Sequence, residues 1–242
     1  LQSRVVEWYH CMLGHPGVKR TAVMITQHLL WPGLHQQVED YVTKCEACQL
    51  YKGQKKKYGH LPIKDAEIQP WKILCVDLIG PYRVRNKKGK QSLHAMTMFD
   101  PATSWFEVTE IPNKKAITCA NLVENYWLCR YPRPQECIFD NGSEFLGQDF
   151  INTLEAYGIK PIATTIKNPA ANMVERVHQT LGNLIRVYEL EEYDFPHGDP
   201  WSNILASAAW AIRSTFHTTL GATPGQLIYG RDMLYDISFK AN

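Results

Sequence analysis

The chain has 242 residues, 45% of them hydrophobic, which suffices for one large domain or two small ones with a substantial core. Its 26 Lys and Arg against 24 Asp and Glu give a net charge of only +2, so composition alone does not indicate a nucleic-acid ligand. No apolar run approaches the ~18 residues of a membrane span, the N-terminus lacks a signal-peptide profile, and seven irregularly spaced cysteines favour a reducing, intracellular compartment over a secreted disulfide framework.

The first part of the chain contains two helical patterns. Apolar residues recur at helical spacing from Val18 to Leu29 and from Val38 to Cys45, and Trp31-Pro32-Gly33 separates the two runs. A module of about 50 residues buries too little surface to be comfortably stable by its core alone. We therefore expect a further link between its beginning and its end.

Two histidines and two cysteines flank this helical region and are predicted to supply that link. They are His10, His15, Cys45 and Cys48. Such a set forms a tetrahedral site for one structural Zn²⁺, which would contribute folding free energy directly. Cys11, His28 and His35 are competing candidates, but the two histidines would bind from the middle of the helical region rather than from its ends.

A basic segment follows the module. Residues 53–66 show no amphipathic period and are predicted to be a linker. Basic side chains gather at 52–57 and again at 83–90. Each cluster is interpreted either as a solvated loop or as a surface that contacts DNA.

From about residue 67 the pattern changes to alternating strands and helices. The near-continuous apolar run Ile73–Ile79, closed by Gly80-Pro81, predicts a strand buried on both faces. The remaining predicted elements are antiparallel strands at 94–99 and 104–111 with a turn at 100–103, a helix at 117–129, a strand ending at Asp140, a helix at 148–157, a strand at 161–165, a helix beginning at Glu175 and a last helix at 201–216. This order predicts an α/β fold, a mixed sheet flanked by helices.

Three acids stand out against these elements. Asp77 ends an apolar run, Asp140 ends another and precedes Asn141-Gly142, and Glu175 opens a helical pattern. If the fold brings them together, their mutual repulsion requires neutralising cations. Hard divalent ions such as Mg²⁺ prefer oxygen ligands, and two of them about 4 Å apart can align the oxygens of a phosphoryl transfer.

Three neighbouring residues have open roles. Glu144 is interpreted either as a residue near the substrate or as an acid that favours the start of the following helix. Asp100 is predicted to be a turn residue. His178 lies one helical turn after Glu175, so it is expected either to hydrogen-bond near the acids or only to pack.

The motifs together resemble, over nearly the whole chain, the integrase of a long-terminal-repeat retroelement of the Ty3/gypsy group. The matching segments are the His-His-Cys-Cys set with Trp31-Pro32-Gly33, Pro70-Trp71, Val76–Pro81, Asp140–Phe145, Glu175–Leu181 and Thr223–Arg231. Any one of these motifs is weak evidence, whereas all of them in the family order form a specific signal.

The resemblance implies a ribonuclease-H-like core in which Asp77, Asp140 and Glu175 bind two Mg²⁺ or Mn²⁺ ions. It implies two reactions: water cleaves a phosphodiester near the end of the element's DNA, and the exposed 3′-hydroxyl then attacks host DNA. It also implies DNA as substrate, homo-oligomers, no membrane partner, and a place in the nucleus and in a cytoplasmic retroelement particle.

The expected domains are a zinc-binding helical domain at 1–52, the linker at 53–66, a catalytic core at 67–220 and the start of a C-terminal extension at 221–242. The chain has no initiator methionine and ends without a clear stop, so we expect it to be a segment of a longer protein.

One departure from the family pattern concerns the spacing of the acids. Between Asp140 and Glu175 there is one residue fewer than the family usually has, and the missing position falls within 167–174. If the loop absorbs the deletion, Glu175 keeps its place. If the helix rotates instead, Glu175 turns by about 100° and leaves the site. The alternative hypothesis is therefore a decayed or domesticated integrase that binds DNA without catalysis.

Overall fold

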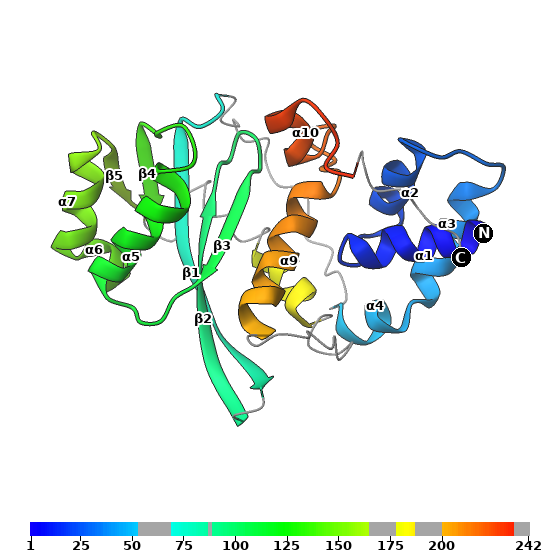
Figure 1. Cartoon of the computed structure of the whole chain (residues 1–242), viewed down its shortest axis with the longest axis horizontal. Helices are drawn as coiled ribbons and strands as arrows, with labels where there is room; N and C mark the ends of the chain where they lie inside the picture. The colour runs from blue at the N-terminus through cyan, green and yellow to red at the C-terminus, as the bar shows by residue number, and fades with distance from the viewer. Residues whose placement is uncertain (53–68, 87–88, 165–177, 187–199, 235–242) are drawn as a thin grey trace. The chain divides into compact units, whose positions relative to one another are not determined.

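The computed structural model describes residues 1–52, 69–86, 89–164, 178–186 and 200–234 (Figure 1). The predicted linker, Glu175 and the end of the C-terminal extension lie outside the described residues, and the side chains of the basic cluster at 83–90 do as well. The chain forms two compact units, each built from several segments: Leu1–Gly59, Thr180–Asp194 and Trp210–Asn242 make unit 1, and His60–Gln179 with Phe195–Ala209 makes unit 2. The two units are defined only by their compactness, so the domain limits expected from the sequence stay a prediction.

Unit 1 begins with four helices, α1 (Gln2–Met12), α2 (Val18–Thr26), α3 (Leu34–Lys44) and α4 (Glu46–Tyr51). The two helical patterns seen in the sequence are confirmed as α2 and α3, whereas α1 and α4 were not predicted. Gly33 precedes α3 with a φ of 82°, a left-handed conformation that glycine adopts readily. Buried apolar side chains from the first three helices form a common core that includes Val5, Ile25 and Val38.

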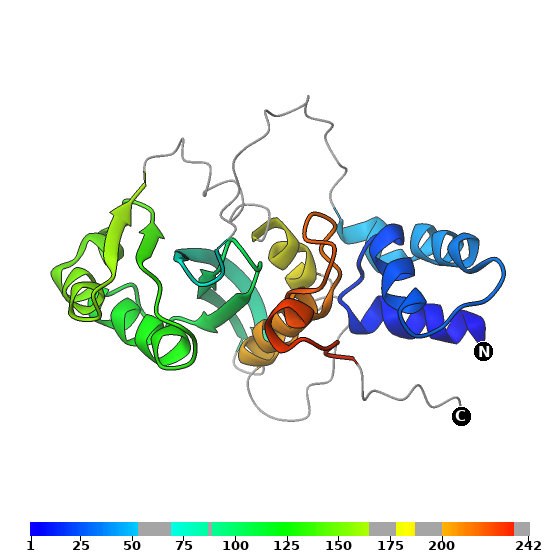
Figure 2. The ribbon, with the colours of Figure 1, turned by 90° about the horizontal axis from the view of Figure 1, so that it is seen from above.

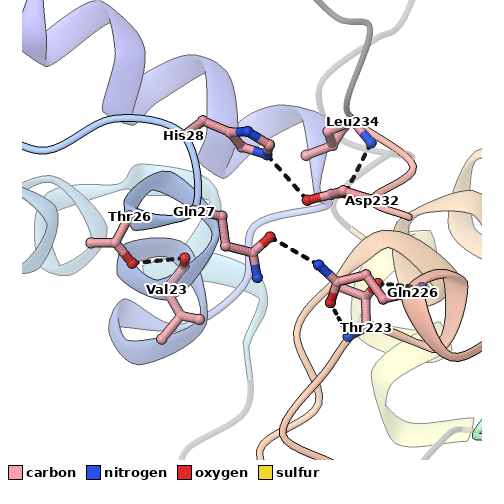
Figure 3. A network of polar contacts seen from close by, with 8 residues as sticks. All are labelled: Val23, Thr26, Gln27, His28, Thr223, Gln226, Asp232 and Leu234. Atoms are coloured by element: carbon pink, nitrogen blue, oxygen red, sulfur yellow. Dashed lines mark hydrogen bonds and ion pairs between the residues drawn. The ribbon is translucent and has the colours of Figure 1, made fainter. Parts of the chain in front are cut away.

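The later part of the chain adds to this same core. Helix α10 (Pro224–Tyr229) starts with a capping box in which Thr223 and Gln226 satisfy each other's backbone N–H groups. Leu234 is 3% exposed and belongs to the core of the N-terminal helices. Figure 3 shows two polar contacts that accompany it: His28 Nε2 lies 3.1 Å from Asp232 Oδ2, and Gln226 donates to Gln27 at 3.3 Å.

Unit 2 is built on a five-stranded sheet with the order β3-β2-β1-β4-β5. Its strands are β1 (Ile73–Asn86), β2 (Gly89–Phe99), β3 (Phe106–Glu110), β4 (Glu136–Phe139) and β5 (Lys160–Ala163). The first three pair antiparallel, while β4 is parallel to both β1 and β5. The predicted mixed α/β sheet is thereby confirmed, including the antiparallel partners on either side of the turn at 100–103.

The first strand is longer than the sequence indicated. The prediction that Gly80-Pro81 closes it is wrong, because β1 continues to Asn86 with a register shift against β2 between Ile79 and Tyr82. Gly80 has a φ of 114°, and a Cβ there would lie 2.7 Å from the carbonyl oxygen of Leu93. Glycine at this position therefore permits a bulge and an extended strand, where the sequence pattern indicated a stop.

Helices cover the sheet and complete the core of unit 2. Helix α5 (Ala116–Val123) passes into a π-helical turn, η1 (Glu124–Leu128), and short α6 (Ser143–Leu146) precedes α7 (Gln148–Ala156). Figure 2 shows α5 and α7 side by side, in agreement with their contacts. The last long helix is α9 (Pro200–Ser214), and a further helix is described at 178–186; each has residues in both units. Within the described residues, no helix combines the length and apolarity needed to cross a membrane.

Candidate functional site

The four predicted zinc ligands come together in unit 1. One ligand atom from each of His10, His15, Cys45 and Cys48 lies within 4.8 Å of all the others. The thiol sulfur of Cys48 is 3.3 Å from His10 Nε2 and 3.8 Å from His15 Nδ1, and that of Cys45 is 3.4 Å from His15 Nδ1. Donor atoms about 2.0–2.3 Å from a tetrahedral Zn²⁺ are separated by distances of this size. The donor set therefore fits Zn²⁺ in both chemistry and spacing.

Local backbone geometry brings these donors together. His10 is in the last turn of α1, and a sharp turn through Gly14 (φ 68°) and His15 (φ 57°) points the chain back. The backbone N–H of His15 donates to the carbonyl of His10 at 2.7 Å and closes this turn. Cys45 and Cys48 flank the first turn of α4, one as its N-cap and one inside the helix. Two local structures far apart in sequence thus each supply a pair of ligands.

Burial adjusts the protonation of the cluster. Desolvation lowers the pKa of His10 to about 3 and that of His15 to about 4, and the nearby charge of Lys52 acts in the same direction on both. Both imidazoles are therefore neutral at pH 7, the form that binds a metal. Burial raises the pKa of the Cys48 thiol, so without a cation its thiolate is disfavoured.

The competing ligands are engaged elsewhere. Cys11 Sγ lies 4.0 Å from the hydroxyl of Tyr41, and His28 pairs with Asp232. The group of possible metal ligands found in the described part of the chain contains neither of these residues nor His35.

In unit 2 the sheet brings the first two acids to the same level. Cys75 on β1 is paired with Ile138 on the parallel strand β4, and Asp77 and Asp140 each lie two residues further along. Neighbouring strands are about 4.8 Å apart. The two acids therefore meet at the edge where β4 ends and β1 continues. Glu175 lies outside the described residues, so its convergence with this pair stays a prediction.

The carboxylate of Asp77 is partly buried and held by its surroundings. Its Oδ1 accepts a hydrogen bond of 2.7 Å from the backbone N–H of Leu78, and its Oδ2 lies 3.6 Å from His178 Nδ1. Burial is the main cause that raises the pKa of Asp77 to about 6, and the charges of Asp140 and Glu144 raise it further. An acid with this environment gains from a nearby cation, which would stabilise its ionised form.

Asp140 and Glu144 lie on the exposed side of this edge. Asp140 is exposed, and its Oδ1 accepts from the N–H of Gly142 at 3.0 Å. Glu144 is in the first turn of α6, which agrees with its interpretation as an acid near a helix start, while its charge also reaches Asp77. Asp100 is confirmed as a turn residue, because its buried carboxylate accepts from the backbone N–H groups of Ala102 and Thr103.

Thr97 is a residue that sequence reasoning missed. It lies on β2 directly opposite Asp77 and is 2% exposed. Its hydroxyl oxygen lies 3.1 Å from the backbone carbonyl oxygen of Asp77 and 2.8 Å from His178 Nε2, within hydrogen-bonding distance of both. The only signal in the sequence was a polar residue in an apolar strand, which does not specify a partner.

Two segments of the chain match families of integrase domains. Residues 1–54 match the family described as "Integrase zinc binding domain", and residues 68–169 match the family described as "Integrase core domain". The chain thus contains the zinc-binding and core domains of integrases, in that order, with a ribonuclease-H-like core.

The chain is also similar to integrase-like proteins of the gypsy type. "Gypsy retrotransposon integrase-like protein 1" of Pongo abelii is 24% identical over 221 residues, which cover 90% of this chain and 40% of that protein. The chain therefore spans well under half of this curated relative.

Two solved structures share the fold. An intasome of simian T-cell lymphotropic virus with a PP2A regulatory subunit aligns with a TM-score of 0.61 at 15% identity, over 91% of this chain and 74% of that one. The catalytic core domain of HTLV-2 integrase in complex with magnesium aligns with a TM-score of 0.50 at 24% identity, over 65% of this chain and 95% of that one.

Proposed function

We propose that this protein is a DNA integrase that processes the 3′ ends of retroelement DNA and joins them to host DNA. The observation that carries the proposal is the placement of Asp77 and Asp140 at one level on neighbouring parallel strands, inside a segment that matches the integrase core domain. In the first reaction, water cleaves a phosphodiester near a DNA end. In the second, the 3′-hydroxyl produced attacks a phosphodiester of the target.

Asp77 and Asp140, together with Glu175, would hold two Mg²⁺ or Mn²⁺ ions. When bound, such ions supply Lewis-acid stabilisation and lower the pKa of the attacking hydroxyl or water. Asp77 presents Oδ2 while Leu78 binds Oδ1, so one edge of its carboxylate is oriented in advance. The exposure of Asp140 leaves room for a DNA strand to approach the same edge of the sheet.

The His10, His15, Cys45 and Cys48 cluster would hold one Zn²⁺ in a structural role. Four protein donors complete a tetrahedral shell, whereas catalytic zinc keeps a position open for water or substrate. The ion would connect the end of α1 to the start of α4. Zinc binding is therefore expected to stabilise the helices of unit 1 and not to take part in phosphoryl transfer.

DNA ends and target DNA are the proposed substrates, and the working form is a homo-oligomer, because two DNA ends must be joined in one event. Two related structures support this view: one is an intasome of simian T-cell lymphotropic virus, and the other is a trimeric form of the HTLV-2 integrase catalytic core domain. We further propose that the protein acts inside the cell, in the nucleus and in the particle that carries the element's DNA.

A strand-joining assay with short duplex ends tests the function. With MgCl₂ the unaltered chain is expected to give joined products, and Asp140→Asn and Glu175→Gln are each expected to abolish them. Glu155→Gln, an exposed change in α7, is the matched control and should remain active. Joining that survives both acid substitutions would refute the metal–carboxylate mechanism. DNA binding without any joining would instead favour the non-catalytic alternative.

A further inference from the structure

His178 makes a polar bridge between the neighbouring strands β1 and β2 at Asp77. Its Nε2 lies 2.8 Å from the hydroxyl of Thr97, and its Nδ1 lies 3.6 Å from Asp77 Oδ2. Thr97 and Asp77 are direct partners in the antiparallel register of β1 and β2. One imidazole therefore touches both members of a cross-strand pair, from a helix described at 178–186.

The hydrogen-bond inventory fixes how this bridge is made. An ionised carboxylate only accepts, so Nδ1, which faces Asp77 Oδ2, must carry the ring hydrogen for the contact to be favourable. Nε2 is then an acceptor and takes the single hydrogen of the Thr97 hydroxyl at 2.8 Å. Thr97 is 2% exposed, so no competing solvent is expected to replace this interaction. The imidazole ring is thereby held in one orientation with Nδ1 toward the carboxylate.

The Asp77 carboxylate is consequently held from two sides. Leu78 binds Oδ1 at 2.7 Å, and the fixed imidazole faces Oδ2. Rotation about the terminal torsion of an aspartate is soft, so without these neighbours the carboxylate would sample a broad range of orientations. A divalent ion needs the oxygen in one direction, and small hard ions such as Mg²⁺ tolerate little departure from octahedral geometry.

We propose that His178 is a positioning residue which, through its hydrogen bond to Thr97, holds the Asp77 carboxylate in the orientation that binds a divalent cation. The inference rests on the proposed function only in its choice of cation site. Neither His178 nor Thr97 needs to contact the ion or the DNA. Their role is to set the affinity of Asp77 for the ion, as partners of metal ligands do in other proteins, where their loss typically weakens metal binding about 10–100-fold.

Direct ion binding tests this proposal independently of catalysis. The 242-residue chain, loaded with zinc, is titrated with Mn²⁺, and free Mn²⁺ is followed by electron paramagnetic resonance. Asp77→Asn should abolish the binding that is attributed to this site. Thr97→Val keeps the shape of the side chain and removes only the hydroxyl, and we expect it and His178→Ala to raise the Kd at least about tenfold.

Three further variants separate positioning from packing. His178→Asn can place an N–H near the position of Nδ1 and should recover part of the lost affinity. The double variant Thr97→Val/His178→Ala should have a Kd for Mn²⁺ no higher than that of the single variant with the higher Kd, because both changes break the same bridge. Thr109→Val, in β3 and two strands away from Asp77, should leave the Kd unchanged.

The outcomes are distinct for the two proposals. A folded Thr97→Val or His178→Ala protein whose Kd stays within twofold of the unaltered chain overturns the positioning role, and so does ion binding that is unaffected by Asp77→Asn. If the variants change the Kd as expected while the unaltered chain joins no DNA, the positioning role stands and the integrase function fails. In an active protein, raising MgCl₂ should restore the rate of His178→Ala, which a merely structural defect would not do.

Discussion

Asp77→Asn is expected to stabilise the protein in the absence of divalent cations. The pKa of Asp77 rises from its ordinary value of 3.8 to about 6, mainly through burial, so the ionised carboxylate is disfavoured in the folded state. A rise of this size means that the ionised carboxylate lowers the free energy of unfolding by about 3 kcal/mol when the group is fully ionised. Because 31% of the side chain is exposed, solvent screening reduces the expected gain to about 1–2 kcal/mol.

The pH dependence follows from the same shift. Below pH 3.8 the carboxyl is protonated in both the folded and the unfolded state, so the penalty is absent. It grows as the pH rises from about 4 and is complete above about 6. The free energies of unfolding of the unaltered chain and of Asp77→Asn should therefore agree near pH 3.5, and their difference should reach its full size at pH 8. Asparagine keeps an acceptor for the Leu78 N–H, so that hydrogen bond is preserved.

Urea denaturation followed by tryptophan fluorescence measures this difference, in buffers freed of divalent cations other than bound zinc. The control Glu155→Gln changes an exposed acid and should shift stability by less than about 0.5 kcal/mol at any pH. Added MgCl₂ should stabilise the unaltered chain and not Asp77→Asn. Equal stability of the two at pH 8, or a gain that persists undiminished at pH 3.5, would refute the reasoning.

Three other perturbations have specific expected results. Cys48→Ser should reduce bound zinc from one ion per chain to almost none and lower the melting temperature of unit 1, as measured by metal analysis and calorimetry; unchanged melting would contradict a structural ion. Asp232→Asn removes the carboxylate that lies 3.1 Å from His28 Nε2 and should lower the free energy of unfolding by about 1 kcal/mol, seen as faster amide exchange in α2; unchanged exchange would show that Leu234 alone holds this contact. Gly80→Ala should lower the free energy of unfolding by about 2–4 kcal/mol, as measured by urea denaturation. Gly158 has a φ of 73°, but a Cβ there would have no neighbour within 4 Å, so Gly158→Ala should lower it by about 1 kcal/mol. Similar losses for the two variants would argue against the steric explanation.

The element types were accessible from the sequence because local periodicity reports burial. The helical spacing from Val18 and from Val38 corresponds to α2 and α3, and the apolar run from Ile73 corresponds to the first part of β1. The error at Gly80 has a physical reason: Gly-Pro usually ends a strand, and only the pairing with β2 shows that the strand continues through a bulge.

The composition of each site was also accessible, because metal chemistry restricts the side chains that can serve. Two histidines and two cysteines at the ends of a small helical module indicate zinc, and the structure brings their donor atoms together. Asp77 follows the apolar first part of β1 and Asp140 follows β4, which places both at the level where the parallel pairing of these strands ends. Glu175 lies outside the described residues, so its place in the site stays a prediction.

The sequence by itself determined the kinds of elements, the candidate metal ligands and the order of the two segments that match integrase domains, because these depend on local periodicity and on the chemistry of single side chains. Tertiary structure decided which distant groups meet. The Thr97–His178–Asp77 bridge and the packing of Leu234 into the N-terminal core join residues many positions apart. Such contacts depend on the register of strands and on how helices pack, and no local pattern encodes either.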